Sequence, residues 1–226
     1  MAERNDPRES IIDRRLDGIK KLAVVSAKGG VGKSTVSAIL ALLLAEKAKV
    51  GVLDLDAYNP SIPTILGMRE LRVGEDRGIT PQSFRGMQVL SFAHFSGDRA
   101  MPLRGRELSD AVKELLAVTT WDADLLIIDT PPGTGEVTLD LLRFFRDARF
   151  LVVTTPSALA KMALDRELEL LGRSRVIGVL ENMSERDCDL CVRYSKEIEM
   201  ACGDTDRLMS LADGMRNMAE EIWRRL

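Results

Sequence analysis

Eight consecutive residues combine the side chains and the backbone freedom needed to hold phosphate groups. They read Lys28-Gly29-Gly30-Val31-Gly32-Lys33-Ser34-Thr35. Glycines let backbone N–H groups approach phosphate oxygens, and a helix that starts at the end of such a run adds the positive end of its dipole. Lys33 can reach the β- and γ-phosphates of a nucleotide, and the Ser34 hydroxyl is placed to bind Mg²⁺. The run predicts a phosphate-binding loop.

The surroundings of this loop support the same prediction. Residues 22–25 read as a short buried strand and residues 33–47 as a long apolar helix, so strand, turn and helix come in the required order. The strict motif opens with glycine and here has Ala27, a small residue that can also turn. The alternative is a glycine-rich turn that binds nothing.

Two carboxylates, Asp54 and Asp56, lie at the carboxyl end of the next predicted strand, residues 50–55. Ligands of open α/β sheets bind beyond the carboxyl ends of the strands, which is where Asp56 is expected to lie. Asp54 is one strand period away on the same face and can act on Mg²⁺ through a water molecule. For both residues the alternative is a carboxylate that caps the following turn.

A further carboxylate, Asp129, follows the four apolar residues Leu125-Leu126-Ile127-Ile128. This is the Walker B pattern, in which a buried strand delivers one carboxylate to the Mg²⁺ shell of a nucleotide. The next loop, residues 130–135, contains glycines that let it shift when a γ-phosphate is lost. Because phosphoryl transfer needs mainly positioning and charge neutralisation, these parts suffice for slow ATP hydrolysis.

Cys188 and Cys191 are spaced so that one turn can offer two thiolates to a metal centre. A closed site needs four ligands, and the chain has no obvious further pair. A symmetric dimer would bring two such pairs together and complete a Cys₄ set for a [4Fe–4S] cluster. Zinc on the same thiolates, unligated thiols and a redox pair are the alternatives. Cys202 is expected to be a free or buried thiol.

Short apolar strands alternate with helices along most of the chain. Strands that are apolar throughout are buried on both faces. We therefore predict an α/β fold of three layers, a P-loop NTPase fold whose mostly parallel sheet is flanked by helices on both faces. Further strands are expected at residues 87–92, 150–154 and 176–180, and further helices at residues 107–118, 136–145 and 158–171.

The two ends of the chain and one internal stretch lie outside this pattern. Residues 1–20 are predicted to be an N-terminal arm or peripheral helix, and residues 21–226 a single P-loop domain. Residues 68–86 mix charges, Gly and Pro, which is typical of a surface connection with little regular structure. From about residue 205 the chain reads as one amphipathic helix with an apolar stripe typical of core packing: Leu208, Leu211, Met215, Met218 and Ile222.

The composition limits the compartment and the partners. A chain of 226 residues with 45% hydrophobic content suits one large domain with a sizeable core. With 32 basic and 35 acidic residues there is no basic surplus for nucleic acid, and the mixed charges of the C-terminal helix disfavour stable membrane association. No apolar run approaches the ~18 residues that span a bilayer. Few cysteines and no signal peptide predict a soluble, cytoplasmic protein.

Lys28 is a second lysine inside the phosphate loop, beside paired glycines. In this the loop resembles the deviant phosphate loop of the MinD/ParA/Mrp superfamily, whose extra lysine contacts phosphate across a dimer interface. The resemblance implies a dimer that responds to nucleotide, with Lys28, Lys33 and Asp56 as catalytic residues. Asp56 matches the position that holds or orients the attacking water there. The alternative for Lys28 is a solvated loop lysine.

Four further segments carry a closer resemblance: DLDAYNPSIP (residues 54–63), IDTPPGTGE (128–136), VTTP (153–156) and VLENMS (179–184). Together they resemble the Mrp/ApbC-type (nucleotide-binding protein) iron–sulfur carrier ATPases over residues 16–191. The resemblance implies that Asn182 hydrogen-bonds the adenine, with a turn-forming Asn as the alternative. It also implies a [4Fe–4S] cluster bridged between Cys188 and Cys191 of two subunits.

Two features depart from that family's pattern. Asp189 replaces the proline that usually follows the first cysteine, which puts negative charge near an anionic cluster. The usual Gly-rich stretch and final strand are absent, and the predicted C-terminal helix stands in their place. This change is expected to remove a segment that flanks the adenine pocket.

Three hypotheses of function follow. The first is an ATP-dependent carrier, most simply a homodimer, that holds a [4Fe–4S] cluster between its subunits and delivers it to apo-proteins. The second is a positioning ATPase of the MinD/ParA class, whose ATP-driven dimer binds a protein, membrane or DNA partner. The third, a reductase like the nitrogenase iron protein, is disfavoured because no cysteine precedes Cys188.

Overall fold

The computed structural model describes residues 6–96, 101, 103, 105–133, 135–186, 188 and 190–226. Its strands are β1 (Lys20–Val25), β2 (Val50–Asp54), β3 (Gly74–Glu75), β4 (Ile79–Thr80), β5 (Gln82–Phe84), β6 (Met87–Ser91), β7 (Leu125–Asp129), β8 (Arg149–Thr154), β9 (Val176–Ser184) and β10 (Cys191–Arg193). Its α-helices are α1 (Pro7–Arg15), α2 (Lys33–Leu44), α3 (Ile62–Ile65), α4 (Ala93–Ser96), α5 (Arg106–Val118), α6 (Glu136–Phe144), α7 (Ala158–Leu171), α8 (Lys196–Ala201), α9 (Thr205–Ala212) and α10 (Arg216–Arg225).

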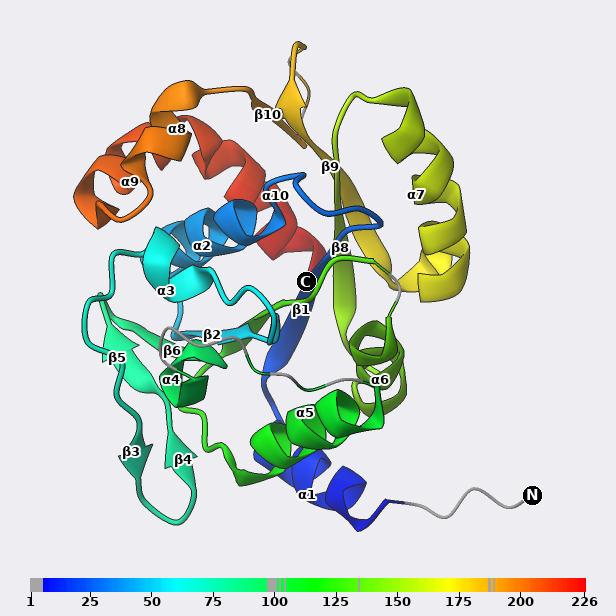
Figure 1. Cartoon of the computed structure of the whole chain (residues 1–226). Coiled ribbons are helices and arrows are strands. Elements are labelled where there is room, and N and C mark those ends of the chain that lie inside the picture. Colours follow the sequence, from blue (N-terminus) through cyan, green and yellow to red (C-terminus); the bar gives the residue numbers. More distant parts are fainter. Residues whose placement is uncertain are drawn as a thin grey trace.

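Within the described residues, eight strands form one sheet in the order β10-β9-β8-β1-β7-β2-β6-β5. Neighbouring strands run parallel, apart from the antiparallel pair β5 and β6. Because β1 pairs with both β7 and β8, the loop that follows β1 emerges at the centre of the carboxyl edge of the sheet. The mostly parallel α/β sheet that the sequence predicts is confirmed (Figure 1).

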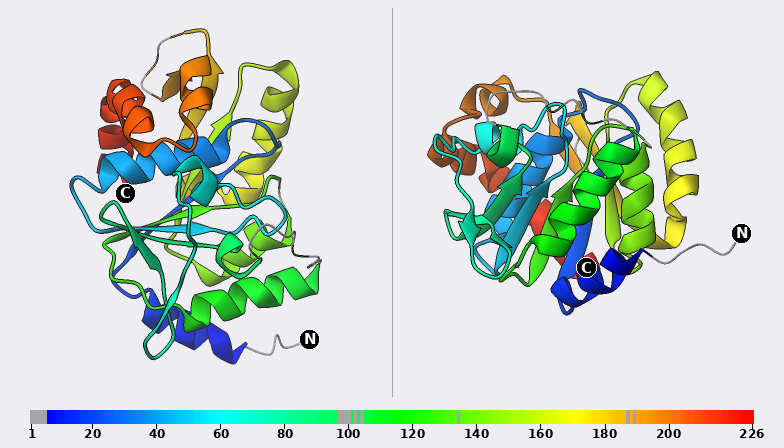
Figure 2. Two further views of the ribbon diagram at one scale, coloured as in Figure 1. Left: turned by 60° about the vertical axis from the view of Figure 1, so that its left-hand side comes forward. Right: turned by 60° about the horizontal axis from the view of Figure 1, so that its bottom comes forward.

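Helices cover both faces of the sheet, which gives three layers (Figures 1 and 2). On one face α2 packs with α9 and α10 around a core to which β1 contributes Leu22 and Val24. On the other face α1, α5, α6 and α7 enclose a second core, to which β1 contributes Ala23 and Val25. Strand β1 is therefore buried on both sides, as its unbroken apolar sequence indicates.

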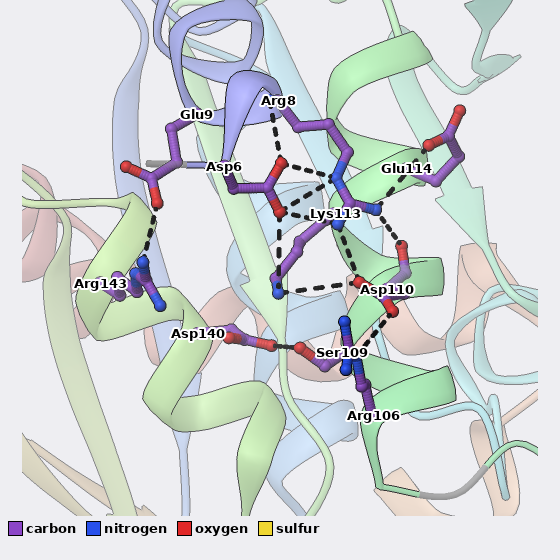
Figure 3. A network of polar contacts seen from close by, with 10 residues as sticks. All are labelled: Asp6, Arg8, Glu9, Arg106, Ser109, Asp110, Lys113, Glu114, Asp140 and Arg143. Carbon is purple, nitrogen blue, oxygen red and sulfur yellow. Dashed lines mark hydrogen bonds and ion pairs between the residues drawn. The ribbon is translucent and has the colours of Figure 1, made fainter. Parts of the chain in front are cut away.

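The N-terminal helix α1 is attached to the second face of the sheet. It begins after Asp6, whose side chain accepts a hydrogen bond from the backbone N–H of Arg8. Ile12 and Leu16 are buried in the core, while a polar network holds the outer side of the helix to α5 and α6 (Figure 3). The pairs in this network include Arg8 with Asp6, Arg8 with Asp110, Glu9 with Arg143, and Ser109 with Asp140.

The prediction of little regular structure at residues 68–86 was wrong in part. Gly74–Glu75 and Ile79–Thr80 pair as a two-stranded antiparallel ribbon, and Gln82–Phe84 adds an edge strand to the main sheet. Edge strands and small ribbons draw much of their stability from neighbouring elements, so their short polar sequences carry a weak local signal.

The prediction of one C-terminal helix from about residue 205 was also wrong. Helix α9 ends at Ala212, a 3₁₀ turn spans Asp213–Met215, and α10 starts at Arg216. Gly214 lies in this turn, and glycine is about 1 kcal/mol less favourable than alanine inside a helix. The break lets both helices pack on α2, where Leu208, Met218 and Ile222 are buried, so the apolar stripe is core packing.

Candidate functional site

The phosphate loop joins β1 to α2 and takes the backbone shape that its glycines allow. Gly30 and Gly32 have φ angles of 78° and 77°, in the left-handed region that favours glycine. Gly32 is also the N-cap of α2, and a Cβ atom there would clash with Nδ2 of Asn182. The loop therefore brings backbone N–H groups and the N-terminus of α2 to one place, which is the arrangement that binds phosphate.

Asp129 is the centre of a buried cluster beneath this loop. Nζ of Lys33 lies 2.7 Å from Oδ1 of Asp129, and the Ser34 hydroxyl donates to Oδ2 at 2.6 Å. The Ser37 hydroxyl also donates to Oδ1, at 2.8 Å. Asp129 has no exposed surface, and the Lys33 ammonium and these two hydroxyls take the place of the water that would otherwise stabilise its charge. The structure thus places together the lysine, serine and carboxylate that the sequence assigned to one nucleotide and its Mg²⁺.

A cavity of about 500 Å³ lies in front of the loop. The Ser26 hydroxyl lines it and is buried without a hydrogen-bond partner among the described residues. Such a donor fits a phosphate oxygen, because an unpaired buried polar group is costly. The wall also includes the loop residues Gly29, Gly30, Val31, Gly32, Lys33, Ser34 and Thr35, together with Asp56, Tyr58, Asn59, Ser61, Ile65 and Pro132.

Asp56 lies in this cavity and also shapes the chain around it. Its Oδ1 atom accepts the backbone N–H groups of Tyr58 and Asn59 at 3.1 and 3.0 Å. These are the contacts of a carboxylate that caps a turn, the alternative that the sequence left open. The turn fixes the orientation of the carboxylate toward the phosphate loop.

Asp54 is fully buried at the end of β2, next to Asp129 in the register of the sheet. It accepts the backbone N–H groups of Asp56 and Ile62 and the Ser91 hydroxyl, at 3.1, 3.2 and 3.0 Å. Burial, reinforced by the negative charge of Asp129, raises the pKa of Asp54. These contacts hold the segment between β2 and α3, and its action on Mg²⁺ stays a prediction.

A second cavity, of about 300 Å³, continues from the phosphate loop along α2. Gly30, Gly32 and Thr35 line both cavities, so a nucleotide can extend from one into the other. Asn182 is at this junction, and its Nδ2 atom donates to the backbone oxygen of Val31 at 2.8 Å. That hydrogen bond ties β9 to the phosphate loop and leaves Oδ1 of Asn182 as an acceptor.

The C-terminal region supplies one wall of this second cavity. The departure from the family pattern was expected to remove a segment that flanks the adenine pocket, and that expectation stays a prediction. In the structure β10, α8, the 3₁₀ turn before α10 and α10 itself line the cavity with a largely apolar wall. It consists of Val192, Arg193, Tyr194, Ser195, Ile198, Glu199, Cys202, Met215 and Met218.

The loop that follows β7 is hydrogen-bonded to the phosphate loop. The backbone N–H of Gly133 donates to the backbone oxygen of Ser26 at 2.7 Å, which joins the loop after β7 to the phosphate loop. Thr134 of that loop lies outside the described residues. Lys28 is exposed on the phosphate loop, a position that suits both a catalytic lysine and a solvated loop lysine.

The cysteine pair follows the carboxyl end of β9: Cys188 lies in the connection to the edge strand β10, and Cys191 is the first residue of that strand. Cys188 and Cys191 are joined by a disulfide, with Cα atoms 5.1 Å apart. A metal cluster would require the reduced pair. Within the described residues no group of three or more His, Cys, Asp and Glu side chains could hold a metal ion. Cys202 is a free, exposed thiol, and Asp189 lies outside the described residues.

Sequence reasoning missed three parts of the site. Ser37 has a local signal, since it follows Ser34 by about one helical turn and so faces the same carboxylate. Ser26 directly follows β1, and a single serine at that position carries no distinct signal in the sequence. The C-terminal wall of the second cavity has no local signal, because it depends on how α8, α9 and α10 fold back over α2.

No helix of the described residues is long and apolar enough to cross a bilayer.

The chain matches the ParA family, described as NUBPL iron-transfer P-loop NTPase, over residues 19–210. The iron-sulfur cluster carrier proteins of Rickettsia felis and of Escherichia coli (strain K12) are both 40% identical to it, over 175 and 184 residues. The matched part covers 75% and 78% of this chain, and 55% and 50% of those two proteins. The chain therefore spans about half the length of the curated relatives it matches.

Solved structures give the same picture of the fold. The nucleotide-binding protein of Archaeoglobus fulgidus in complex with ADP is 27% identical, with a TM-score of 0.72 over 90% of this chain and 93% of that chain. The cell division ATPase MinD of Pyrococcus furiosus is 22% identical, with a TM-score of 0.66 over 92% of this chain and 99% of that chain. The likeness to MinD concerns the fold alone, and it confirms the predicted P-loop NTPase architecture.

Proposed function

Because the chain belongs to the ParA family of NUBPL-type iron-transfer P-loop NTPases, we propose that it carries iron–sulfur clusters under the control of ATP. It binds ATP, hydrolyses it slowly, and assembles or transfers a [4Fe–4S] cluster to apo-proteins. The cluster is its cargo, bridged between the Cys188 and Cys191 pairs of two subunits. One observation carries this proposal: the strand that positions Asn182 at the nucleotide cavity ends at Ser184, four residues before the first cysteine of the pair.

The phosphate half of the proposal follows from the cluster around Asp129. On nucleotide binding Lys33 turns from Asp129 to the β- and γ-phosphates, while the N–H groups of the loop hold the remaining oxygens. Mg²⁺ fits the oxygens of Ser34 and Asp129, because this hard cation commonly takes one or two carboxylates together with substrate phosphates. When bound, it supplies charge neutralisation at the phosphates.

Hydrolysis would use Asp56, which lines the phosphate cavity, and Lys28, which is exposed on the loop. Asp56 is held by its turn so that it can orient a water molecule toward the γ-phosphate. Lys28 is exposed on the loop, where it can reach the phosphate of a second subunit. On this view Lys28→Ala lowers ATP hydrolysis and ATP-dependent dimer formation, while the ADP affinity of the single subunit stays within about threefold.

The base of the nucleotide would occupy the second cavity. Oδ1 of Asn182 can accept a hydrogen bond from the adenine amino group, since Nδ2 is already engaged by Val31. The apolar wall from the C-terminal region supplies the face on which an aromatic ring is buried.

The cluster half depends on a pair of thiolates that one chain cannot complete into a four-ligand site. Four thiolates from two subunits suit a [4Fe–4S] cluster, with zinc as the less favoured occupant. We propose a homodimer, with apo-proteins as recipients and no nucleic-acid or stable membrane partner. A positioning ATPase of the MinD/ParA class is the second candidate, because it shares the fold, but it does not account for the cysteine pair.

The test is anaerobic reconstitution with iron, sulfide and a thiol reductant, followed by iron and acid-labile sulfide analysis. The wild type should bind one [4Fe–4S] cluster per two chains and elute as a dimer. Cys188→Ala and Cys191→Ala should lose the cluster, while Cys202→Ala is the matched control and should keep it. If the two variants bind as much iron and sulfide as the wild type, the cysteine pair is not the cluster site.

A further inference from the structure

A buried carboxyl group lies directly behind the phosphate loop and has no part in the chemistry described above. Glu167 of α7 is 1% exposed, and neither of its carboxylate oxygens makes a hydrogen bond of regular geometry among the described residues, although the backbone N–H of Ala27 is near enough to stabilise its charge. A carboxylate buried without partners is costly, since burial removes the water that stabilises its charge. A residue that carries this cost needs an explanation beyond packing.

The surroundings of Glu167 connect it to the loop. It lines a cavity of about 10 Å³, which holds at most about one water molecule. On the loop side this cavity is lined by Ala27, Lys28 and Val31. The carboxyl group therefore lies behind the same short backbone segment whose front faces the phosphate cavity.

Burial is the main cause that raises the pKa of Glu167, to about 7, and the backbone N–H of Ala27 opposes it. Among the described residues that line the cavity, Lys28 is the other titratable group, and it is exposed. Strand β8 contributes the uncharged Val153 and Thr154. The charged neighbours on α7 are exposed to solvent: Asp165, Arg166 and Glu169.

We propose that Glu167 is a positioning residue of the phosphate loop, and that nucleotide phosphates bind best when its carboxyl group carries a proton. An ionised Glu167 attracts the N–H of Ala27 toward the back of the loop and repels anions at the front. A protonated Glu167 carries no charge, so both effects become much weaker. The inference rests on the nucleotide half of the proposed function and is independent of the iron–sulfur cargo.

The coupling is reciprocal, because two ligands that affect each other's binding do so by the same factor. Bound phosphate therefore favours the protonated form of Glu167, and the protein takes up protons when a nucleotide binds near neutral pH. Affinity for Mg-ADP should fall as pH rises through about 7, by roughly three- to tenfold between the protonated and ionised limits.

Isothermal titration calorimetry tests this with Mg-ADP and the full chain, at pH 6 to 8.5 in buffers of different ionisation enthalpy. The wild type should take up a fraction of a proton per ADP near pH 7, and Glu167→Gln should lose that uptake and the matching part of the pH dependence. Glu169→Gln changes an exposed carboxylate on the same helix and should behave like the wild type. Because excess Mg²⁺ and the same nucleotide are used throughout, ionisation of ADP itself cancels between the variants.

Glu167→Met provides a second variant of similar volume without a titratable group, in case Glu167→Gln folds poorly. Proton uptake that is equal in the wild type and in either Glu167 variant overturns the inference, as does a wild type that takes up no proton. If the wild type does not bind Mg-ADP at all, the nucleotide half of the proposed function fails instead, so the two failures are distinguishable.

Discussion

The phosphate site and the cysteine loop differ in how much of each the chain completes by itself. At the phosphate site the carboxylate of Asp129 is fully buried and receives donors from Lys33, Ser34 and Ser37. At the cysteine pair Cys188 is exposed, and Cys191 begins β10, a three-residue strand at the edge of the sheet. The groups around the buried Asp129 all come from one chain, whereas the cysteine pair lies at an exposed edge of the sheet.

This difference matches the two tasks that we propose. A nucleotide site must keep its geometry through repeated turnover, which favours groups fixed on rigid central strands. A carrier must release its cargo, which is easier at an exposed site whose remaining ligands come from a second subunit. The continuous strand β9 links the two, because it carries Asn182 at one site and ends beside the other.

The largest expected effect comes from removing the lysine of the buried cluster. Lys33→Ala leaves Asp129 buried without its ammonium partner, which should cost about 3 kcal/mol of folding stability. ADP affinity should fall at least about a hundredfold, since a charge-assisted phosphate contact is lost as well. Denaturant unfolding and calorimetry measure the two effects.

Lys47→Ala is the matched control, because Lys47 forms an exposed ion pair with Glu220. It should leave both folding stability and ADP affinity essentially unchanged. Retention of ADP affinity by Lys33→Ala would mean that the loop is not the phosphate site.

The next effect distinguishes two glycines of one loop. Gly32→Ala combines a left-handed φ angle with a clash against Asn182, so it should cost roughly 2–3 kcal/mol and weaken ADP binding more than tenfold. Gly30→Ala has the same φ angle, but its Cβ atom meets nothing within 4 Å, so only about 1 kcal/mol is expected. Thermal unfolding and ADP titration of the two variants give the comparison, and equal losses would contradict it.

A smaller effect concerns the pH dependence of folding stability. Because the pKa of Glu167 is raised from 4.5 to about 7, its contribution to stability is full below pH 4.5 and is lost as pH rises through about 7. Between pH 5 and 8.5 the wild type should lose about 2–3 kcal/mol relative to Glu167→Gln. Urea unfolding across this range measures the difference, which should be absent for Glu169→Gln.

The smallest effect lies outside both regions, in the network that attaches α1 (Figure 3). Arg8→Ala removes the partly buried ion pairs with Asp6 and Asp110 and should cost about 0.5–1 kcal/mol of folding stability. The cost should be smaller at high salt, which screens the charges. The Arg8 guanidinium lowers the pKa of Asp6 to about 2, so this contribution is lost as pH falls from about 4 toward 2. ADP affinity and iron content should not change.

Much of the site was predictable from the sequence because it is local. The phosphate loop and Asp129 each follow an apolar strand, and a parallel sheet brings the carboxyl ends of its strands to one edge. The two cores follow from the same alternation of buried strands and helices.

The remaining features depend on contacts between distant segments. Glu167 occupies a helical position that sequence alone reads as polar surface, and it is buried only because α7 packs behind the phosphate loop. The turn at Gly214 and the wall that includes Met215 depend on the path of the C-terminal helices over α2. The disulfide between Cys188 and Cys191 reflects oxidation state, which a two-residue spacing does not determine.

Cluster delivery through Cys188 and Cys191 is tested most directly by transfer from the anaerobically reconstituted protein to the apo-form of a [4Fe–4S] enzyme. An iron chelator in the mixture removes free iron, so recovery of enzyme activity reports direct transfer. Wild type and Cys202→Ala should restore activity, and Cys188→Ala should restore none above the chelator background. Equal recovery with Cys188→Ala and the wild type would contradict the proposed carrier function.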